Sequence, residues 1–232
     1  AWRFYGNPRI SRVQLAQPVL EQARTAVAQE CDAYALVIHD WSSLHYKRHA
    51  SKKDRIALTQ TTDPGYLLQT ALAVSDRDGE PLAPVFQGLE GGGRGHTSRA
   101  GGGDPPLSTV DGLAPVMAFV ERLAWDKPRV HIIDAEADSV GHFRHWDREG
   151  YLFLVRADEV NTVRHAGVRR SLREVRQKLR QQDALLFTRE VEYHGQPARL
   201  WVGEAPVTLT RPAQLRRHGQ KGPRTIIRGQ PL

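Results

Sequence analysis

The chain has 232 residues, of which 40% are hydrophobic and 25% are charged, so it can bury one substantial core and a small second one. This composition excludes a disordered tail and a mini-protein, and the sequence has neither a long apolar run nor a secretory signal, which predicts a soluble, cytoplasmic protein. The net charge is +7, and the single cysteine, Cys31, excludes an internal disulfide.

The predicted elements begin with a helical entry segment at residues 1–33. Ser11 is its expected N-cap, and Pro18 either kinks this helix or opens a second one. The apolar run that precedes Asp40 is typical of a buried strand. Two further strands flank a turn at residues 76–79 and are expected to pair as a hairpin.

A glycine-rich stretch separates this hairpin from the next elements. Eight of the sixteen residues at 88–103 are glycine, which predicts a mobile loop. Beyond it, the apolar pattern predicts a helix at 107–125, a strand ending in Asp134, a helix at 139–149 and a strand at 151–158. Strands that alternate with helices indicate a mixed or parallel α/β sheet.

The C-terminal third of the chain is basic. Residues 161–232 contain 15 Lys and Arg against 5 Asp and Glu, whereas the rest of the chain has a balance of −3. A helix at 171–181, opened by Ser171 and Glu174 as a capping box, leads into a predicted β-hairpin and a basic tail. This charge favours a polyanionic partner, most simply nucleic acid, although a solubilising face explains it equally well.

Two aspartates follow apolar strands. Asp40 comes after the first predicted strand, and Asp134 comes after a strand that belongs to a strand–helix–strand unit. If these strands are parallel neighbours, about 4.8 Å apart, the two carboxylates converge at the sheet edge where α/β folds bind ligands. Together they require a cation, and oxygen ligands without cysteine favour Mg²⁺ or Mn²⁺. For either aspartate alone, a turn or a helix cap is the simpler interpretation.

Three blocks of sequence resemble one protein family. They are HDWSSLHY around Asp40, DAEAD from Asp134, and the opening AWRFYGNPRIS. In that order they are similar to the Asp-x-Ser/Thr-x-Leu-x-Tyr, Asp-x-Glu-x-Asp and Arg-Phe-x-x-Asn-Pro segments of the DDE transposases of bacterial cut-and-paste elements. The branch concerned is the insertion-sequence-four family, to which the transposon-five transposase belongs. The interval of 94 residues between the two aspartates suits this resemblance.

The resemblance implies both a fold and a chemistry. The implied fold is α/β, with a ribonuclease-H-like mixed sheet flanked by helices, preceded by the helical entry segment and followed by a β-rich, basic insertion region. The corresponding boundaries are 1–33, 34–183 and 184–232. In the implied chemistry, Asp40 and Asp134 hold Mg²⁺ or Mn²⁺ for cleavage and strand transfer of DNA phosphodiesters. The implied partner is double-stranded DNA at transposon ends, in the bacterial cytoplasm near the nucleoid, and a homodimer of the full-length protein is compatible with this.

The third acidic residue of the family has no counterpart in this chain. The family places a glutamate in a Tyr-x₂-Arg-x₃-Glu-x₆-Lys signature, but no tyrosine here has an arginine three residues on. Glu190, Glu192 and Glu204 lie in strand-like context, so the third acid is expected beyond Leu232. We therefore expect the chain alone to cleave DNA negligibly. If it does cleave, Glu136 is the first candidate for the missing ligand.

Two other functions stay open. A zinc hydrolase could use five histidines: His39, His45, His49, His142 and His145. However, no glutamate follows His45 in the way that a metalloprotease helix requires. The other alternative is a non-catalytic DNA-binding fragment of a transposase, whose contacts to the DNA backbone would make binding steeply dependent on salt.

The basic residues nearest the predicted site follow the strand at 151–158. We expect four of them to border the site and to contact the DNA backbone: Arg156, Arg164, Arg169 and Arg170. The preceding helix is expected to pack Phe143 and Trp146 on the sheet.

Overall fold

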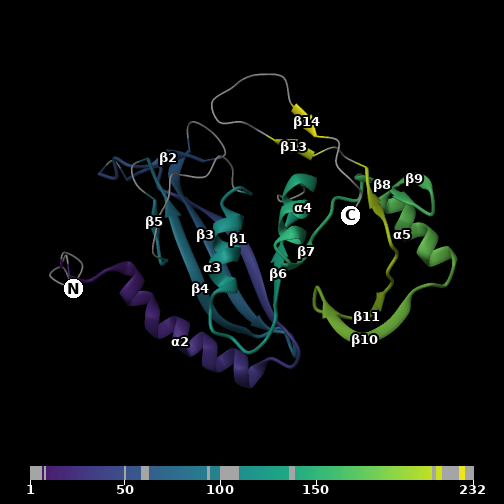
Figure 1. Ribbon diagram of the computed structural model, residues 1–232, viewed down its shortest axis with the longest axis horizontal. Helices are drawn as coiled ribbons and strands as arrows, with labels where there is room; N and C mark the ends of the chain where they lie inside the picture. The colour runs from purple at the N-terminus through teal and green to yellow at the C-terminus, as the bar shows by residue number, and fades with distance from the viewer. Residues whose placement is uncertain are drawn as a thin grey trace. The chain divides into compact units, whose positions relative to one another are not determined.

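The computed structural model describes residues 7, 9–49, 51–58, 63–92, 95–99, 110–135 and 139–210, and the backbone of residues 213–215 and 225–227. The chain divides into two compact units (Figure 1). The first unit comprises residues 1–137 and 146–155, and the second comprises residues 138–145 and 156–232.

The first unit is built on a seven-stranded mixed sheet of order β5-β4-β3-β1-β6-β7, with β2 paired to β3. Its strands are β1 (Ala35–His45), β2 (Ile56–Ala57), β3 (Pro64–Ser75), β4 (Pro81–Glu90), β5 (His96–Thr97), β6 (Arg129–Ile133) and β7 (Leu152–Val155). Strands β1, β6 and β7 are parallel, whereas β3 is antiparallel to both β1 and β4. The predicted mixed sheet and the predicted β3–β4 hairpin are confirmed, and the strand order is compatible with a ribonuclease-H-like sheet.

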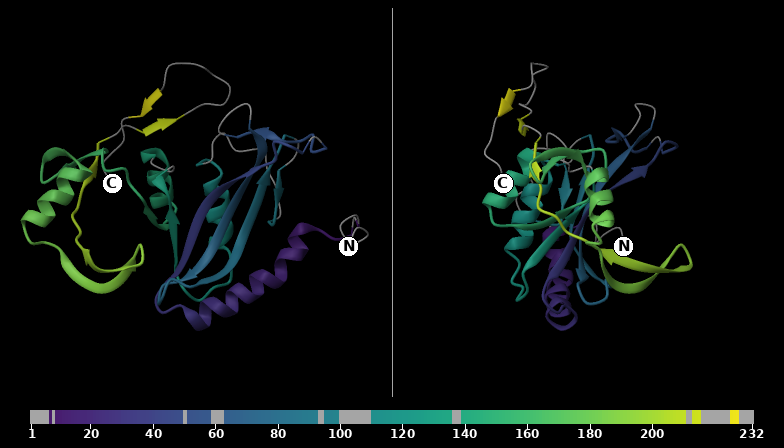
Figure 2. Two further views of the ribbon diagram at one scale, coloured as in Figure 1. Left: turned by 180° about the vertical axis from the view of Figure 1, so that it is seen from behind. Right: turned by 90° about the vertical axis from the view of Figure 1, so that its right-hand side faces the viewer.

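Helix α2 (Arg12–Glu30) packs against β4 and β3 of this sheet (Figure 2). Ser11 is its N-cap, because the Ser11 hydroxyl accepts the backbone N–H of Gln14 while the Gln14 side chain accepts the N–H of Ser11. This reciprocal pair is a capping box and confirms the predicted start of the helix. Pro18 lies inside α2, so the entry segment is one helix rather than two.

The buried core of the first unit lies between the sheet and two helices, α2 and α3 (Leu113–Glu121). Its members are small or aliphatic residues with a few aromatics: Ala23, Val27, Cys31, Ala35, Val37, Ala71, Ala73, Ala83, Val85, Phe86, Val116, Val120 and Trp125. Alanine in the centre of β3 lets the helices approach the sheet closely, and the phenylalanines Phe86 and Phe119 fill the space between β4 and α3.

Helix α4 (Val140–Arg148) contacts the sheet through Trp146, which lies in its last turn. The Trp146 side chain is fully buried and meets Phe153 of β7 edge to face, with ring centroids 5.4 Å apart. Phe143 is half-buried, and Gly150 ends the helical segment with a positive φ of 74°. The predicted burial of Trp146 against the sheet is confirmed.

Strand β1 is longer than the sequence predicts. It continues five residues beyond Asp40, because the polar stretch Trp41–His45 pairs along its backbone with Gly65–Gln69 of β3. The expectation that Asp40 ends its strand is therefore wrong. What ends at that point is the parallel pairing with β6, whose last paired residue is Ile133.

The glycine-rich stretch lies only partly within the described residues. Gly88 to Glu90 belong to β4, and His96 and Thr97 form β5, which pairs with β4. The predicted mobile loop is thus shorter at its start than expected, and residues 93–94 and 100–109 lie outside the described part of the chain.

The described part of the second unit consists mainly of short strands and helix α5 (Leu172–Gln181). Its strands are β8 (Thr162–His165), β9 (Val168–Ser171), β10 (Leu186–Tyr193), β11 (Gln196–Val202), β12 (Thr208–Leu209), β13 (Ala213–Leu215) and β14 (Thr225–Ile227). The predicted capping box of α5 is confirmed, since Ser171 and Glu174 cap each other. The predicted hairpin is also confirmed as β10–β11, with His194 and Gly195 at positive φ in its turn.

Sequence reasoning missed the β8–β9 hairpin. Its turn, Ala166–Gly167, has positive φ at both positions, as a two-residue hairpin loop requires. The flanking residues are rich in arginine, so the turn signal at Gly167 was hidden in a segment that looked only basic. Among the described helices of both units, none has the length and apolar character needed to cross a membrane.

The connection between α2 and β1 is held by one carboxylate, that of Asp76. Its oxygens accept the backbone N–H groups of Asp32, Ala33 and Tyr34 at 2.7, 2.9 and 2.9 Å. Burial by itself raises the pKa of Asp76, but these three donors outweigh it and hold the pKa below its ordinary value. Asp76 therefore fixes the point at which the chain enters the central strand.

We expect Asp76→Ala to lower the free energy of unfolding by at least about 2 kcal/mol, because it leaves three backbone donors without their charged acceptor. Asp78→Ala is the matched control, since the Asp78 carboxylate accepts the exposed N–H of Glu80 within the same turn. Urea unfolding of both variants measures the difference. Equal losses in the two variants would contradict the role given to Asp76.

Candidate functional site

The two predicted acids lie next to each other on the central strands. The parallel register of β1 and β6 runs from Ala35↔Arg129 to His39↔Ile133. Asp40 and Asp134 are the residues that follow the last pair, Asp40 within β1 and Asp134 just after the end of β6. Neighbouring strands are about 4.8 Å apart, so the two backbones approach as the sequence predicted. The predicted adjacency of the strands is confirmed, and the role of the two carboxylates as metal ligands stays a prediction.

The two aspartates face away from the histidine-lined side of the sheet. Side chains alternate between the two faces of a strand, and Val37 and His39 are buried while Asp40 is exposed. Asp134 is exposed as well, and its Oδ1 accepts the backbone N–H of Ala135 at 2.5 Å. Both carboxylates are thus accessible to solvent, and they offer oxygen donors of the kind that Mg²⁺ and Mn²⁺ prefer.

Within the described residues, a third ligand does not join this pair. Among the described residues, no three His, Cys, Asp or Glu side chains come close enough together to hold a metal ion. Glu136, the first candidate named from the sequence, lies outside the described residues. The pair alone can bind a cation through two carboxylates, which is fewer than a two-metal site needs.

A buried hydrogen-bonded chain lies behind the pair, and sequence reasoning did not find it. His39 Nε2 and His131 Nδ1 are 2.8 Å apart, and His131 Nε2 is 3.0 Å from Oε1 of Glu121. The two histidines are 2% and 0% exposed. One signal in the sequence could have revealed the histidines. His39 lies two positions after Val37 and His131 two positions before Ile133, so each histidine occupies a core-facing position of its strand, where an apolar residue is expected.

The histidines that could form a zinc site do not come together within the described residues. His45 is the last residue of β1 and pairs with Asp63, with Nδ1 2.8 Å from Oδ2, while His49 follows in a turn. They therefore do not share a helix face. His142 and His145 lie on α4, where His142 Nδ1 is 2.7 Å from the hydroxyl of Ser139. None of these histidines joins a three-ligand group within the described residues.

The four predicted DNA-binding arginines belong to the second unit, whereas the two aspartates belong to the first. Arg164 and Arg169 are cross-strand partners in the β8–β9 hairpin and both are exposed. Arg170 is half-buried and pairs with Val163, so it faces the other side of the hairpin, and Arg156 is exposed beyond β7. That these arginines border the acidic pair stays a prediction.

Arg164 and Arg169 carry like charges on directly opposed positions. Such a pair destabilises an isolated hairpin and is favourable when an anion lies across it. By contrast, Arg173 and Arg176 of α5 both bind the carboxylate of Glu159, which offsets much of their charge. The hairpin face with Arg164 and Arg169 is therefore the better candidate for a phosphate contact.

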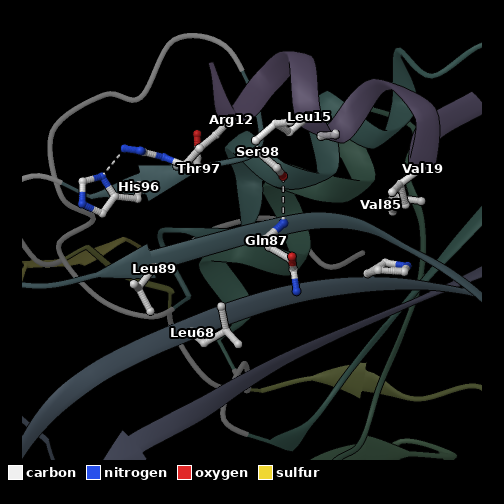
Figure 3. A pocket seen from close by; sticks show the side chains of 12 residues that line it. Arg12, Leu15, Val19, Leu68, Val85, Gln87, Leu89, His96, Thr97 and Ser98 are labelled. Carbon is white, nitrogen blue, oxygen red and sulfur yellow. Dashed lines mark hydrogen bonds between the residues drawn. The ribbon is translucent and has the colours of Figure 1, made fainter. Parts of the chain in front are cut away.

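A surface pocket of about 450 Å³ lies between α2 and the strands β3, β4 and β5 (Figure 3). Its lining is mainly apolar, with Leu15, Val19, Leu68, Val85 and Leu89. At one end the Arg12 guanidinium lies 2.5 Å from His96 Nδ1, as Figure 3 shows. The pocket lining contains neither aspartate of the acidic pair.

Comparison with known proteins assigns no family. No family model matches the chain, and no curated protein matches it. A solved structure described as a Drosophila P element transposase strand transfer complex is similar over 71% of this chain, with 12% sequence identity and a TM-score of 0.31. The match covers 38% of that chain, so the present chain spans well under half of that protein's length.

The buried histidine pair predicts how stability depends on pH. Burial, and then the neighbouring His131, lower the pKa of His39 to about 3. An unfolded histidine titrates near 6.5, so between these two values the unfolded chain binds the extra proton. The free energy of unfolding therefore rises with pH across this window, and falls as the pH drops from 6.5 toward 3.

We expect His39 to contribute a slope that approaches about 1.4 kcal/mol per pH unit within this window. Urea unfolding at several pH values from 4 to 7 measures the total slope, and the variant His39→Leu removes the contribution of this group. A variant that keeps the full slope of the natural protein would show that His39 is not the group responsible.

Proposed function

We propose that this chain is the catalytic-domain portion of a DDE-type DNA transposase, which cleaves and transfers DNA phosphodiesters with Mg²⁺ or Mn²⁺. The observation that carries the proposal is the position of Asp40 and Asp134, one step beyond the last paired residues of two parallel strands at the centre of a mixed sheet. Two exposed carboxylates at this place on a sheet are suited to share a divalent cation.

The chemistry of phosphodiester cleavage fits these residues. The reaction needs an activated water or 3′-hydroxyl and a stabilised leaving oxygen, and bound divalent cations supply both effects without a strong general base. The part of the protein itself would be to orient the cation. Asp40 would do so from a strand that is hydrogen-bonded on both sides up to His39, and Asp134 from the end of β6.

Two further observations support the proposal. The three sequence blocks that resemble insertion-sequence-four transposases fall at the entry segment, at β1 and at the end of β6, in the order the family has them. The hairpin β3–β4 and helix α3 lie between the two acids along the chain, as the resemblance implies. Membership of that particular family, transposon ends as the target, a homodimer and a place near the bacterial nucleoid are parts of the same proposal.

The contact with double-stranded DNA is proposed to involve the basic hairpin of the second unit. Arg164 and Arg169 are exposed on one face of it, with Arg170 and Arg156 nearby in the chain. Contacts of this kind bind phosphates and carry little sequence information. A chain that binds DNA in this way without a metal site would be the non-catalytic DNA-binding fragment, and Mn²⁺ binding that depends on Asp40 and Asp134 separates the two candidates.

We expect the isolated chain to bind Mn²⁺ weakly and to nick a supercoiled plasmid negligibly, because the described residues contain no group of three possible metal ligands. Electron paramagnetic resonance measures Mn²⁺ binding, and gel electrophoresis of the plasmid measures nicking. The variants Asp40→Asn and Asp134→Asn are expected to abolish the weak binding. Mn²⁺ binding that persists in both variants would sink the proposed metal site.

Nicking that is present in the natural chain and lost in Asp134→Asn would overturn the expectation of inactivity while supporting the enzyme. It would also show that the missing ligand lies within these residues. Glu136→Gln is the variant to examine next in that case, and Glu192→Gln is its control, because Glu192 lies on the β10–β11 hairpin.

We expect Arg169→Ala combined with Arg170→Ala to weaken duplex binding equally for all DNA sequences. Each lost phosphate contact lowers the slope of log affinity against log salt by about 0.9. The double variant should lower it by about 0.9 through the exposed Arg169, and by about 1.8 if Arg170 contacts a phosphate as well. The matched control is Arg173→Ala with Arg176→Ala, since Glu159 already pairs both side chains. Fluorescence anisotropy in a salt series measures both. An unchanged slope in the first variant would make this hairpin an ordinary solvated surface.

A further inference from the structure

A continuous hydrogen-bonded chain runs through the core on the face of the sheet opposite to the two aspartates. It begins at Glu121 near the end of α3, whose side chain is 30% exposed, passes through the fully buried His131, and ends at His39. The two bonds measure 3.0 and 2.8 Å. The last atom, Nδ1 of His39, has no hydrogen-bond partner among the described residues.

The chemistry of the donors and acceptors fixes the direction of this chain. An ionised carboxylate only accepts, so His131 donates from Nε2 to Glu121. A neutral His131 then has a lone pair at Nδ1, which accepts the Nε2–H of His39. With both rings neutral, each imidazole is the Nε2–H tautomer, and Nδ1 of His39 carries a lone pair and no proton.

The bond between the two histidines ties β1 to β6 directly beneath the aspartates. His131 is paired in register with Val37, and His39 is paired with Ile133, so the imidazole bond is diagonal across the two strands. It spans the last two paired positions on this face before the parallel pairing ends. The next residues along β1 and β6 are Asp40 and Asp134.

We propose that Glu121, His131 and His39 are positioning residues, which fix the spacing and register of β1 and β6 so that the two carboxylates are held for one divalent cation. This inference rests on the proposed function, because it concerns the same pair of aspartates. The chain acts through the strands and touches neither carboxylate, and it links their separation to the position of α3 through Glu121.

A hydrogen-bonded chain fixes the distance and orientation between two strands more strictly than apolar packing does. Buried apolar side chains attract one another without a preferred direction, whereas hydrogen bonds between rings have one distance and one orientation. Replacing buried polar groups by apolar ones often leaves stability unchanged or increases it, while a fully bonded buried network selects one arrangement. Loss of the chain should therefore affect cation binding more than stability.

The first test uses the natural protein without metal. Long-range ¹H–¹⁵N correlation spectra report which imidazole nitrogen carries the proton, and we expect both His39 and His131 at neutral pH as Nε2–H tautomers. A Nδ1–H tautomer, or a charged ring, at either position would overturn the inference. This result is decided without any variant and without bound Mn²⁺.

The second test compares Mn²⁺ binding by Glu121→Leu and Glu121→Gln, with electron paramagnetic resonance as the measurement. Removing a group that is hydrogen-bonded to a metal ligand typically weakens binding about 10- to 100-fold. Because Glu121 acts only through the strands, we expect Glu121→Leu to weaken Mn²⁺ binding by about 10-fold, at the low end of this range. Glu121→Gln keeps an oxygen that accepts from His131 and should stay within about threefold of the natural protein. Glu21→Leu on α2 is the control, because it removes an exposed carboxylate that binds Arg24.

The outcomes separate this inference from the proposed function. If Asp40→Asn abolishes Mn²⁺ binding while Glu121→Leu binds as tightly as the natural protein, the positioning role is wrong and the metal site stands. Equal weakening in the Leu and Gln variants would assign the effect to charge and would also overturn the positioning role. If neither Asp→Asn variant changes binding, the proposed metal site fails, whatever the tautomers show. Should Glu121→Leu not fold, the tautomers decide.

Discussion

The parallel pairing of β1 with β6 is the contact on which the rest of the site depends. It brings together residues that are 94 positions apart in the chain, and it does so at the centre of the sheet, where neither strand has a free edge. Parallel neighbours need a long crossover, and here the connection carries the β3–β4 hairpin and helix α3. The strand that receives the pairing is in turn fixed at its start by Asp76, which holds the chain between α2 and β1.

Local signals in the sequence were sufficient for much of this architecture. The caps at Ser11 and Ser171, the β3–β4 and β10–β11 hairpins and the alternation of strand and helix follow from residues within a few positions of each other. The full length of β1 could not be predicted from local signals, because Trp41–His45 is held by backbone pairing with β3 and shows no pattern of burial typical of a strand. The β8–β9 hairpin could not be predicted either, since its arginines hide the alternation that marks a strand.

The two acids of the candidate site could be predicted from the sequence, but the buried hydrogen-bonded chain of Glu121, His131 and His39 could not. Asp40 and Asp134 each follow a run of apolar residues, and that pattern alone places them at comparable positions on two strands. The pairing of His39 with His131 depends on a diagonal relation across two strands, which only the register reveals. A histidine in an apolar strand gives no sign of its partner, and Glu121 lies on a helix whose orientation the sequence does not specify.

The unequal lengths of β1 and β6 make the two aspartates mechanically different. The backbone of Asp40 continues into a strand that is bonded to β3 as far as His45, whereas Asp134 stands where β6 has already ended. Asp40 is thus held by the pairing of its own strand, whereas Asp134 lies beyond the last paired residue of β6. In the proposed metal site, one ligand would come from within a paired strand and the other from beyond the end of a strand, so that a change in ionic size would be absorbed mainly on the side of Asp134. Such a site would discriminate less between Mg²⁺ and larger ions than two carboxylates held within paired strands would.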